Sequence, residues 1–390
     1  MAKSKLKVSF VWMMILAVVS VLTLGATGVF SSEPPQRKIV VFKKGVDSGS
    51  ALKIIEKAGG KFKKYYKIIN ARSVELPSEA AGIALSQNPE VLRIDDDIQV
   101  SINKASSTAV KPTQVLPWGV NRIDADLVWG TTTGQAVKVA IIDTGIDTNH
   151  PDLQANIKDG INTISATKGY QDDNGHGTHV AGIIGAVNNT VGVIGVAPKV
   201  SLYVIKALDR NGSGYLSDII EGLQWAVDNH MQVVNMSIGT NSDILSFREA
   251  IAAAYNAGLI MVVAAGNDGP TANSVDYPAA YPGTIAVAAT DSNGQIASWS
   301  SRGPQVDIAA PGVNINSTWN NDNYKTISGT SMATPHVTGT AALILSAKDP
   351  MTPPMTLDAM RTQLMMTAEN LGFAAELQGA GLVDAQKGIQ

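Results

Sequence analysis

Three side chains with the chemistry needed for acyl transfer stand beside apolar runs of the sequence. Asp143 follows the run 137–142, His176 opens the stretch 176–184, and Ser331 precedes the apolar stretch 337–347. A serine hydroxyl becomes a good nucleophile only when a neighbouring base takes its proton, and imidazole has the ordinary pKa that suits this task. A carboxylate beside the imidazole fixes its tautomer and stabilises its charged form. Together these three residue types predict a hydrolytic site.

Each of these residues also has a plain structural interpretation. Asp143 and Ser331 could cap helices, and Asp143 could contact a ribose, although its segment lacks a G-x-G-x-x-G motif. His176 and His179 could ligate a metal, but no H-E-x-x-H motif accompanies them. Asn267, which follows the run 259–265, could be a turn residue or could donate a hydrogen bond to a developing oxyanion. The functional interpretation therefore depends on the four residues meeting in one place.

The elements that would bring them together form an α/β pattern. Beyond residue 113, short apolar runs alternate with helical segments, at 137–142, 201–205, 233–236, 259–264 and 284–288. Nearly continuous apolar strands separated by helices are typical of a buried, mostly parallel sheet. Functional residues of such sheets lie at the carboxyl ends of the strands. Asp143 and Asn267 stand at such ends, and a further apolar helix is predicted over 337–347.

A smaller unit precedes this domain. Strands are predicted at 38–42, 65–69, 73–76 and 91–100, and helices at 51–58 and 78–87. The order β-α-β-β-α-β is that of a small α+β, ferredoxin-like domain. Residues 101–113 are rich in Ser, Thr, Ala, Lys and Pro, which is typical of a linker.

Composition narrows the class of protein. The 390 residues are 45% hydrophobic and 16% charged, which excludes a wholly disordered chain, and the absence of cysteine excludes disulfides and a thiol nucleophile. Residues 33–112 carry 14 Lys and Arg against 9 Asp and Glu, a net charge of +5. Residues 113–390 carry 13 against 24, a net charge of −11. The two parts could attract each other or could simply be independently soluble, and the acidic part disfavours nucleic acid as a partner.

The first residues have the layout of a targeting segment. Lys3, Lys5 and Lys7 precede an apolar run over 8–24, and small residues follow at 25–28. This pattern predicts a signal peptide over 1–30 that is cleaved near residues 26–32, so that the protein is secreted. A retained membrane anchor is the alternative.

Three segments resemble the signatures of the subtilisin-like serine proteases. They are Asp143-Thr144-Gly145, the HGTHVAG stretch 176–182 and the GTSMATPH stretch 329–336, in the order Asp, His, Ser of that family. The resemblance covers about residues 34–390. It implies a subtilisin-like three-layer α/β domain over 114–390, an inhibitory propeptide domain over 33–103 and a linker and processing region over 104–113.

The resemblance also implies roles for individual residues. Asp143 orients, His176 is general base and acid, Ser331 is the nucleophile, Asn267 is the oxyanion donor, and His179 and His336 are structural. Two extended edges that pair with substrate, and an upstream wall of the cleft, are implied at Ser237, Ile238, Gly239, Ala264, Ala265, Gly266, Gly212, Ser213, Gly214 and Leu216. Backbone pairing makes few demands on sequence, so broad specificity toward polypeptides is expected. The family also implies a self-cleaving precursor whose propeptide assists folding and inhibits, and a monomer without a stable membrane partner once the signal is removed.

Calcium is the implied cofactor. The family's tight site matches Gln114, Asp152, Val187, Asn189, Val191 and Val193 in type and spacing, with the valines contributing backbone carbonyls. Such an all-oxygen set suits Ca²⁺. A second, weaker site is implied near Ala279, Tyr281 and Thr284.

The segment after Asn267 implies a specificity feature. In the family it lines the pocket for the residue before the cut bond, and it is shorter here than in well-known relatives. The pocket base, often glycine, aligns with Asp276, with Asp268 at the rim. This predicts a protease that accepts large apolar residues there and tolerates Lys or Arg. Alternatively, Asp276 turns to solvent or the shortened loop shifts the register.

Two other functions remain as alternatives. The chain could be an inactive homologue that binds peptides, although all four chemical positions are intact. It could also be an esterase, but no G-x-S-x-G motif surrounds Ser331.

Overall fold

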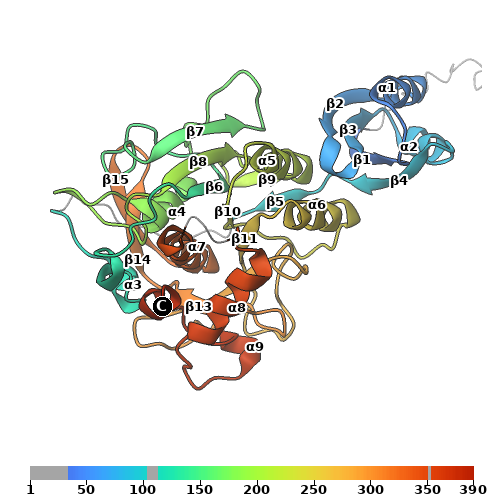
Figure 1. Ribbon diagram of the computed structural model, residues 1–390. Helices are drawn as coiled ribbons and strands as arrows, with labels where there is room; N and C mark the ends of the chain where they lie inside the picture. The colour runs from blue at the N-terminus through green and yellow to red at the C-terminus, as the bar shows by residue number, and fades with distance from the viewer. Residues whose placement is uncertain (1–33, 103–112, 350–352) are drawn as a thin grey trace, which may run out of the picture.

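The computed structural model describes residues 34–102, 113–349 and 353–390 (Figure 1). The predicted signal peptide and most of the predicted linker lie outside these ranges. Within them, no helix is long and apolar enough to cross a membrane.

The small domain has the predicted order of elements. Its strands are β1 (Gln36–Phe42), β2 (Lys61–Tyr66), β3 (Ala71–Leu76) and β4 (Val91–Asp96), and its helices are α1 (Ser48–Lys57) and α2 (Glu79–Ser86). The strands pair antiparallel in the order β2-β3-β1-β4. The two helices pack on the sheet around Val40, Phe42, Ile55, Leu76 and Leu85.

Two predicted strands of this domain have different bounds. The strand predicted over 65–69 runs over 61–66 instead, and a 3₁₀ turn, η1 (Lys67–Ile69), follows and ends at Asn70 in the left-handed region. The strand predicted over 91–100 divides into β4 and β5 (Gln99–Ser101). Asp97 interrupts it because its carboxylate is buried against Arg37 and the Ser217 N–H, each over 2.9 Å. As a result β5 leaves the small sheet and pairs with β9 (Ser213–Tyr215) of the large domain.

The large domain is built on a seven-stranded sheet. Its order is β13 (Ile308–Pro311), β12 (Ile285–Thr290), β11 (Ile260–Ala264), β10 (Val233–Met236), β6 (Lys138–Asp143), β8 (Ser201–Lys206) and β7 (Ile157–Asn162). Every pair is parallel, which confirms the buried parallel sheet. The sequence analysis missed the two edge strands. β7 is polar because one side is exposed, and β13 is short and ends in a proline, which edge strands tolerate.

Helices cover both faces of this sheet (Figure 1). α4 (His176–Gly185) packs against α7 (Thr330–Ala347), which lies along β10–β13, and α5 (Leu216–Asp228) packs with α6 (Leu245–Asn256) on the other face. The remaining elements are α3 (Trp118–Arg122), η2 (Asp126–Val128), the hairpin β14 (Ile315–Trp319) and β15 (Asn323–Ile327), α8 (Leu357–Thr367), α9 (Ala375–Gln378) and α10 (Ala385–Gly388).

The helix α7 begins seven residues before the predicted start, so Ser331 lies in its first turn. Pro335 lies inside this helix and has no N–H to donate to the carbonyl four residues earlier, which is that of Ser331. The Ser237 hydroxyl donates to that carbonyl instead, over 2.9 Å. Because of the proline, the Ser331 carbonyl is free to accept this hydrogen bond, which joins the start of α7 to the residue after β10.

Carboxylates of the small domain cap two helices of the large one. The helices α5 and α6 have no capping side chain at their own N-cap residues. Asp97 accepts a hydrogen bond from the Ser217 N–H of α5 over 2.9 Å, and Asp95 accepts one from the Ser246 N–H of α6 over 3.1 Å. Such capping stabilises a helix by about 1 kcal/mol. The small domain therefore completes the starts of both helices.

Candidate active site

The site lies at the point between β6 and β10 where the order in which strands are added to the sheet reverses. The neighbouring strands β6 and β10 are parallel, and β8 and β7 extend the sheet on one side while β11, β12 and β13 extend it on the other. A crevice forms at the carboxyl ends of the strands at such a switch point. Asp143 is the last residue of β6, and Ser237 directly follows β10. The sheet topology therefore places Asp143 beside the segment 237–239.

Asp143 and His176 form a buried pair. His176 Nδ1 lies 2.8 and 2.9 Å from the two carboxylate oxygens of Asp143, and the side chains are 4% and 1% exposed. The first turn of α4 approaches the β6 end closely because residue 177 is glycine: a Cβ there would lie 2.2 Å from the Gly145 carbonyl oxygen. The arrangement fixes the Nδ1–H tautomer and leaves Nε2 for proton transfer.

A second carboxylate, missed by the sequence analysis, holds this pair in place. Asp172 Oδ1 accepts a hydrogen bond from the Thr144 hydroxyl over 2.9 Å, and Asp172 Oδ2 accepts from the backbone and hydroxyl of Thr178 over 3.0 and 2.6 Å. Thr144 Oγ1 in turn accepts from the Gly177 N–H over 2.9 Å. Asp172 thus links the turn after Asp143 to α4. The sequence did offer a signal. Asp172 stands four residues before His176, and the glycine at the N-cap of α4 has no side chain to cap the helix itself, so a nearby carboxylate was to be expected.

Ser331 lies in the first turn of α7 and is 4% exposed. Its hydroxyl donates a hydrogen bond to the Ser237 carbonyl over 3.0 Å. His176 Nε2 is buried and has no hydrogen-bond partner among the described residues. The expected Ser331–His176 hydrogen bond is therefore not formed in this structure, and Nε2 remains free to accept a proton.

The side-chain amide of Asn267 has a defined orientation. Its Oδ1 accepts hydrogen bonds from the Thr330 N–H and the Thr330 hydroxyl, over 3.0 and 2.9 Å. Its Nδ2 faces the turn that carries Ser331, since a Cβ at Gly329 would lie 3.6 Å from it. Asn267 can therefore donate to an oxygen that develops charge beside Ser331.

Comparison with known proteins decides the family. The sequence model of the subtilase family matches residues 134–382. The chain belongs to the subtilase family of serine endopeptidases. This subtilase is 45% identical over 307 residues to a thermostable alkaline protease of Halalkalibacterium halodurans, which covers 78% of this chain and 80% of that protein. It is 41% identical to subtilisin E of Bacillus subtilis over 374 residues, with 94% of both chains covered. It is also 41% identical to subtilisin J of Geobacillus stearothermophilus over 376 residues, which covers 95% of this chain and 94% of that protein.

The other two histidines of the subtilase motifs are buried and face backbone carbonyls. His179 Nε2 faces the carbonyls of Ile315 and Lys325 over 3.1 and 2.9 Å, and His336 Nδ1 faces the Met332 carbonyl over 2.9 Å. Burial lowers the pKa of His179 to about 3 and that of His336 to about 4, so both are uncharged near neutral pH. His179 Nδ1 is buried without a hydrogen-bond partner, but among the described residues no group of three His, Asp or Glu could hold a metal there, which argues against the metal pair.

An extended segment of the chain itself lies along the predicted substrate edges. Strand β5 pairs antiparallel with β9, and the Ile102 N–H donates to the Gly212 carbonyl over 2.9 Å. On its other side Ser101 bridges to Gly239, whose N–H donates to the Ser101 carbonyl over 3.4 Å. Two of the predicted substrate segments, 212–216 and 237–239, therefore border this extended chain.

The third predicted segment, 264–266, is placed differently. The Ala265 N–H donates to Val287 and the Ala265 carbonyl accepts from Asp276, while the Gly266 carbonyl accepts from Ser301. The Gly266 N–H donates to Thr330. These backbone groups bond within the domain, so this segment does not pair with the extended chain 99–102 as 212–215 and Gly239 do. Ala264–Gly266 instead borders the Asp276 side chain.

The six predicted calcium ligands come together around Asp152, which is fully buried. Residues 113–115 run beside the loop 187–193, and Asn189 Nδ2 and the Val193 N–H donate to the two Asp152 oxygens over 2.8 and 2.9 Å. Gln114 Nε2 is buried there without a partner. One carboxylate, two amides and several carbonyls are an all-oxygen donor set that suits Ca²⁺, provided that the Asn189 amide turns its oxygen inward. Among the described residues no group of three His, Asp or Glu offers an alternative metal site.

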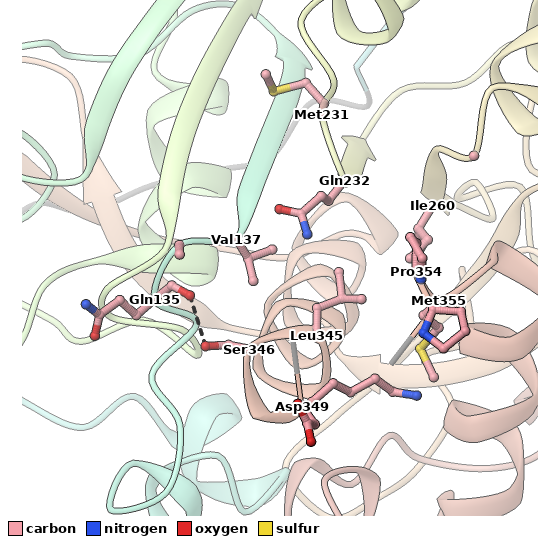
Figure 2. Close-up of a pocket in the computed structure, with 14 residues that line it drawn as sticks. Gln135, Val137, Met231, Gln232, Ile260, Leu345, Ser346, Asp349, Pro354 and Met355 are labelled. Carbon is pink, nitrogen blue, oxygen red and sulfur yellow. Dashed lines mark hydrogen bonds between the residues drawn. The ribbon is translucent and has the colours of Figure 1, made fainter. Parts of the chain in front are cut away.

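A separate cavity of about 470 Å³ lies at the other end of the strands (Figure 2). It is lined by residues that precede or begin strands, among them Val137, Gln232 and Ile260. The carbonyl of Gln135, on its wall, already accepts from Ser346 over 3.0 Å. The cavity is therefore at the amino ends of the strands, away from Asp143, and is not part of the site.

Proposed function

We propose that this subtilase is a secreted endopeptidase of broad specificity that uses Asp143, His176 and Ser331 as its catalytic triad. The observation that carries the proposal is the buried Asp143–His176 pair at the same sheet edge as Ser331 and Asn267. An extended segment of the chain lies beside these residues, as a peptide substrate would.

In the acylation step, Ser331 Oγ attacks the carbonyl carbon of the peptide bond. The hydroxyl must first leave the Ser237 carbonyl and transfer its proton to His176 Nε2, which is otherwise without a partner. Asp143 stabilises the imidazolium, and the carbonyl oxygen, now negative, receives a hydrogen bond from Asn267 Nδ2. The imidazolium then gives its proton to the leaving amine, the C–N bond breaks and an ester on Ser331 remains.

In the deacylation step, water replaces the leaving amine. His176 Nε2 takes a proton from the water as its oxygen attacks the ester carbon, and Asn267 stabilises the second oxyanion. The proton returns to Ser331 Oγ as the ester bond breaks, which releases the carboxylic acid and restores the serine.

Backbone pairing supports the breadth of the specificity. The segments 212–215 and 237–239 present carbonyls and N–H groups to an extended chain on both sides, as they do to residues 99–102. Main-chain hydrogen bonds give affinity that is nearly independent of side chains. A polypeptide substrate would take the position that β5 occupies.

Residues 33–103 act, in this proposal, as an inhibitory propeptide that assists folding. The segment 99–102 blocks the substrate edges, and Asp95 and Asp97 cap the helices α6 and α5. Ion pairs also join the basic small domain to the acidic large one, as between Lys64 and Asp218 over 2.9 Å. Ser331 would cut the chain after this segment, and the released propeptide would remain bound.

One calcium ion would stabilise the large domain. The residues that would hold it are Gln114, Asp152 and Asn189 through side chains, and Val187, Val191 and Val193 through carbonyls. A bound calcium ion would link the loop 187–193 to Gln114 and Asp152 and so stabilise the folded state, and it would take no part in the reaction. The second site is not proposed. The carbonyls of Ala279 and Tyr281 accept from the Thr284 hydroxyl over 3.1 and 3.0 Å, and the Thr284 carbonyl accepts from Arg361.

Labelling with a fluorophosphonate tests the proposal, because only an activated serine reacts. We expect modification of Ser331 in the processed protein, hydrolysis of casein and of peptide amides, and loss of all three in Ser331→Ala. Loss of the equivalent asparagine from a subtilisin is known to lower kcat about 10²–10³-fold. We expect a loss of the same size in Asn267→Leu. Absence of labelling would support an inactive peptide-binding homologue, and cleavage of esters without amides would support an esterase.

A further inference from the structure

Asp276 lies between the two segments that border the reacting bond. A Cβ at Gly239, after β10, would lie 2.7 Å from Asp276 Oδ2, and a Cβ at Gly266, after β11, would lie 2.5 Å from it. The Asp276 N–H donates to the Ala265 carbonyl over 2.8 Å. The residue is 6% exposed, so the alternative in which its side chain turns to solvent is wrong.

The substrate side chain that precedes the cut bond must lie close to the Asp276 carboxylate. Gly239 binds the backbone of the extended segment, and Asn267 directly follows Gly266. A substrate residue whose carbonyl oxygen reaches Asn267 and whose carbonyl carbon reaches Ser331 therefore has Gly239 and Gly266 on its flanks. Neither glycine has a side chain to fill the space, and the group that both of them face is Asp276.

The charge of Asp276 is not neutralised within the described protein. No Lys, Arg or His forms an ion pair with it among the described residues. Burial raises its pKa to about 7, with a further contribution from the charge of Asp268 and a hydrogen bond to it. Arg302, on the neighbouring segment that carries Ser301, directs its guanidinium to the Ser298 carbonyl instead.

A structural role does not account for the carboxylate. The backbone of Asp276 makes the local hydrogen bonds, to Ala265 and from Ala280, and any residue could make them. Among the described residues no backbone N–H donates to its side chain, in contrast to Asp172 or Asp97. A buried carboxylate without a cation is costly, so a cationic partner supplied by the substrate would offset that cost.

We propose that Asp276, with Asp268 beside it, is the specificity-determining acid of this protease and selects Lys or Arg at the residue whose carbonyl is cut. The selection strengthens as the pH rises, since the carboxylate is neutral in acid and charged in alkali. In acid the same space accepts large apolar side chains. This inference rests on the proposed endopeptidase function.

The test compares peptides that differ only at the residue before a chromogenic amide: Arg, Lys, Phe and Glu. We measure kcat/KM from pH 5.5 to 9 and follow the ratio of Arg to Phe, in which pH effects common to both peptides cancel. The ratio should rise at least about tenfold with a midpoint near pH 7, because close charge pairs in desolvated sites have coupling energies of about 1.5 kcal/mol or more. The Glu peptide should be poor throughout.

Three variants identify the acid. Asp276→Asn should abolish the pH dependence of the ratio, and Asp268→Asn should move its midpoint to lower pH, because a neighbouring negative charge has been removed. Asp159→Asn, an equal charge change on the edge strand β7, should change neither. A wild-type ratio that stays constant with pH, or an unchanged ratio in Asp276→Asn, would overturn the inference.

A measurement on the wild-type enzyme covers the case in which Asp276→Asn does not fold. Benzamidine, a small amidinium, should inhibit competitively, and its inhibition constant should fall about tenfold between pH 5.5 and 8.5. Inhibition that is absent or independent of pH contradicts the inference. Fluorophosphonate labelling of the same enzyme separates the two proposals: if Ser331 is labelled, only the specificity is in question, and if it is not, the endopeptidase function has failed.

Discussion

The Thr330 hydroxyl donates a hydrogen bond to Asn267 Oδ1 over 2.9 Å, and the Thr330 N–H donates a second to the same oxygen over 3.0 Å. The Gly266 N–H donates to the Thr330 hydroxyl over 3.2 Å. Since both lone pairs of Oδ1 are engaged, the amide must present its NH₂ group on the side of Ser331. Thr330 therefore holds the Asn267 amide in this orientation, and in the proposed mechanism it is a positioning residue.

We predict that Thr330→Val lowers kcat about 5- to 10-fold with little change in KM. The variant keeps the side-chain shape and the backbone bond to Asn267. It loses the hydroxyl's hydrogen bond to Asn267, which contributes about 1 kcal/mol, and also the acceptor for the Gly266 N–H. In an Asn267→Leu background the same substitution should cost nothing more, because the amide that it positions is gone. Steady-state kinetics of the four proteins check this, and an equal loss in both backgrounds would contradict the positioning role.

Removal of calcium should destabilise the large domain. An ion that binds the folded state alone stabilises it by about 2.7 kcal/mol at a hundredfold excess over Kd. A chelator should therefore lower Tm and speed autolysis, while fresh samples still label with fluorophosphonate. Asp152→Ala should remove the response to chelator and to added calcium, and Asp159→Ala, an exposed acid, should retain it. A Tm that is indifferent to both reagents in the wild type argues against the site.

The raised pKa of Asp276 predicts a stability cost in alkali. Its pKa is about 7 in the folded protein and near 3.8 when unfolded, so the folded state holds the proton more tightly. The free energy of unfolding should therefore fall as the pH rises from about 4 to 7 and then level off. Asp276→Asn should raise Tm more at pH 8 than at pH 4.5. Calorimetry in the Ser331→Ala background, where autolysis is absent, measures the difference, and an equal change at both pH values would contradict the assignment.

Ion pairs across the domain interface should control release of the propeptide. Lys64 contacts Asp218 and Glu221 of α5, and Arg93 binds Glu249 of α6 through two nitrogens, over 2.6 and 2.9 Å. Each pair is half-buried and contributes about 1 kcal/mol, or about fivefold in affinity. Lys64→Gln or Arg93→Gln should shorten the lag before activity appears.

The matched control for this prediction is Lys63→Gln. Lys63 pairs with Glu75 over 3.0 Å within the small domain, so its loss changes the charge equally without touching the interface. Moderate salt should shorten the wild-type lag and should act less on the two interface variants. Equal lags in all the variants would show that these pairs do not hold the propeptide.

The fold was predictable where its elements are strongly apolar. The central strands β6, β8, β10, β11 and β12 were found because burial on both faces makes each a continuous apolar run. The polar edge strand β7 and the division between β4 and β5 were not found, because each depends on a tertiary environment. Asp97, for example, is the last of three consecutive acids in the sequence, and only the structure shows that it is buried against Arg37 and Ser217.

The same distinction holds at the site. Asp143, His176, Ser331 and Asn267 were recognised because each stands at an element end within a motif. The partners that orient them were not, because they lie far away in sequence. Thr330 is 63 residues from Asn267, and Ser237 is 94 residues from Ser331. The segment 212–215, which pairs with β5, was assigned to the wall of the cleft because nothing local distinguishes an edge that pairs from one that does not.

The register of β5 predicts the bond at which the precursor is cut. Ser101 faces Gly239 in antiparallel pairing, and Ser237 precedes Gly239 by two residues. The Ser331 hydroxyl lies 3.0 Å from the Ser237 carbonyl. We therefore predict a cut two residues beyond Ser101, between residues 103 and 104, in agreement with a propeptide that ends at 103.

Intact-mass measurement of purified protein checks this prediction. The wild type should yield a mature chain that begins at residue 104, at a rate independent of protein concentration, because the cleft and the cut segment belong to one molecule. Ser331→Ala should remain uncut. A mature chain that begins beyond about residue 106, or a Ser331→Ala protein that matures when purified alone, would contradict self-cleavage in this register. A rate that rises with concentration would instead indicate cleavage by a second molecule. The pairing of β5 with β9 of its own chain would then not be what brings the cut bond to Ser331.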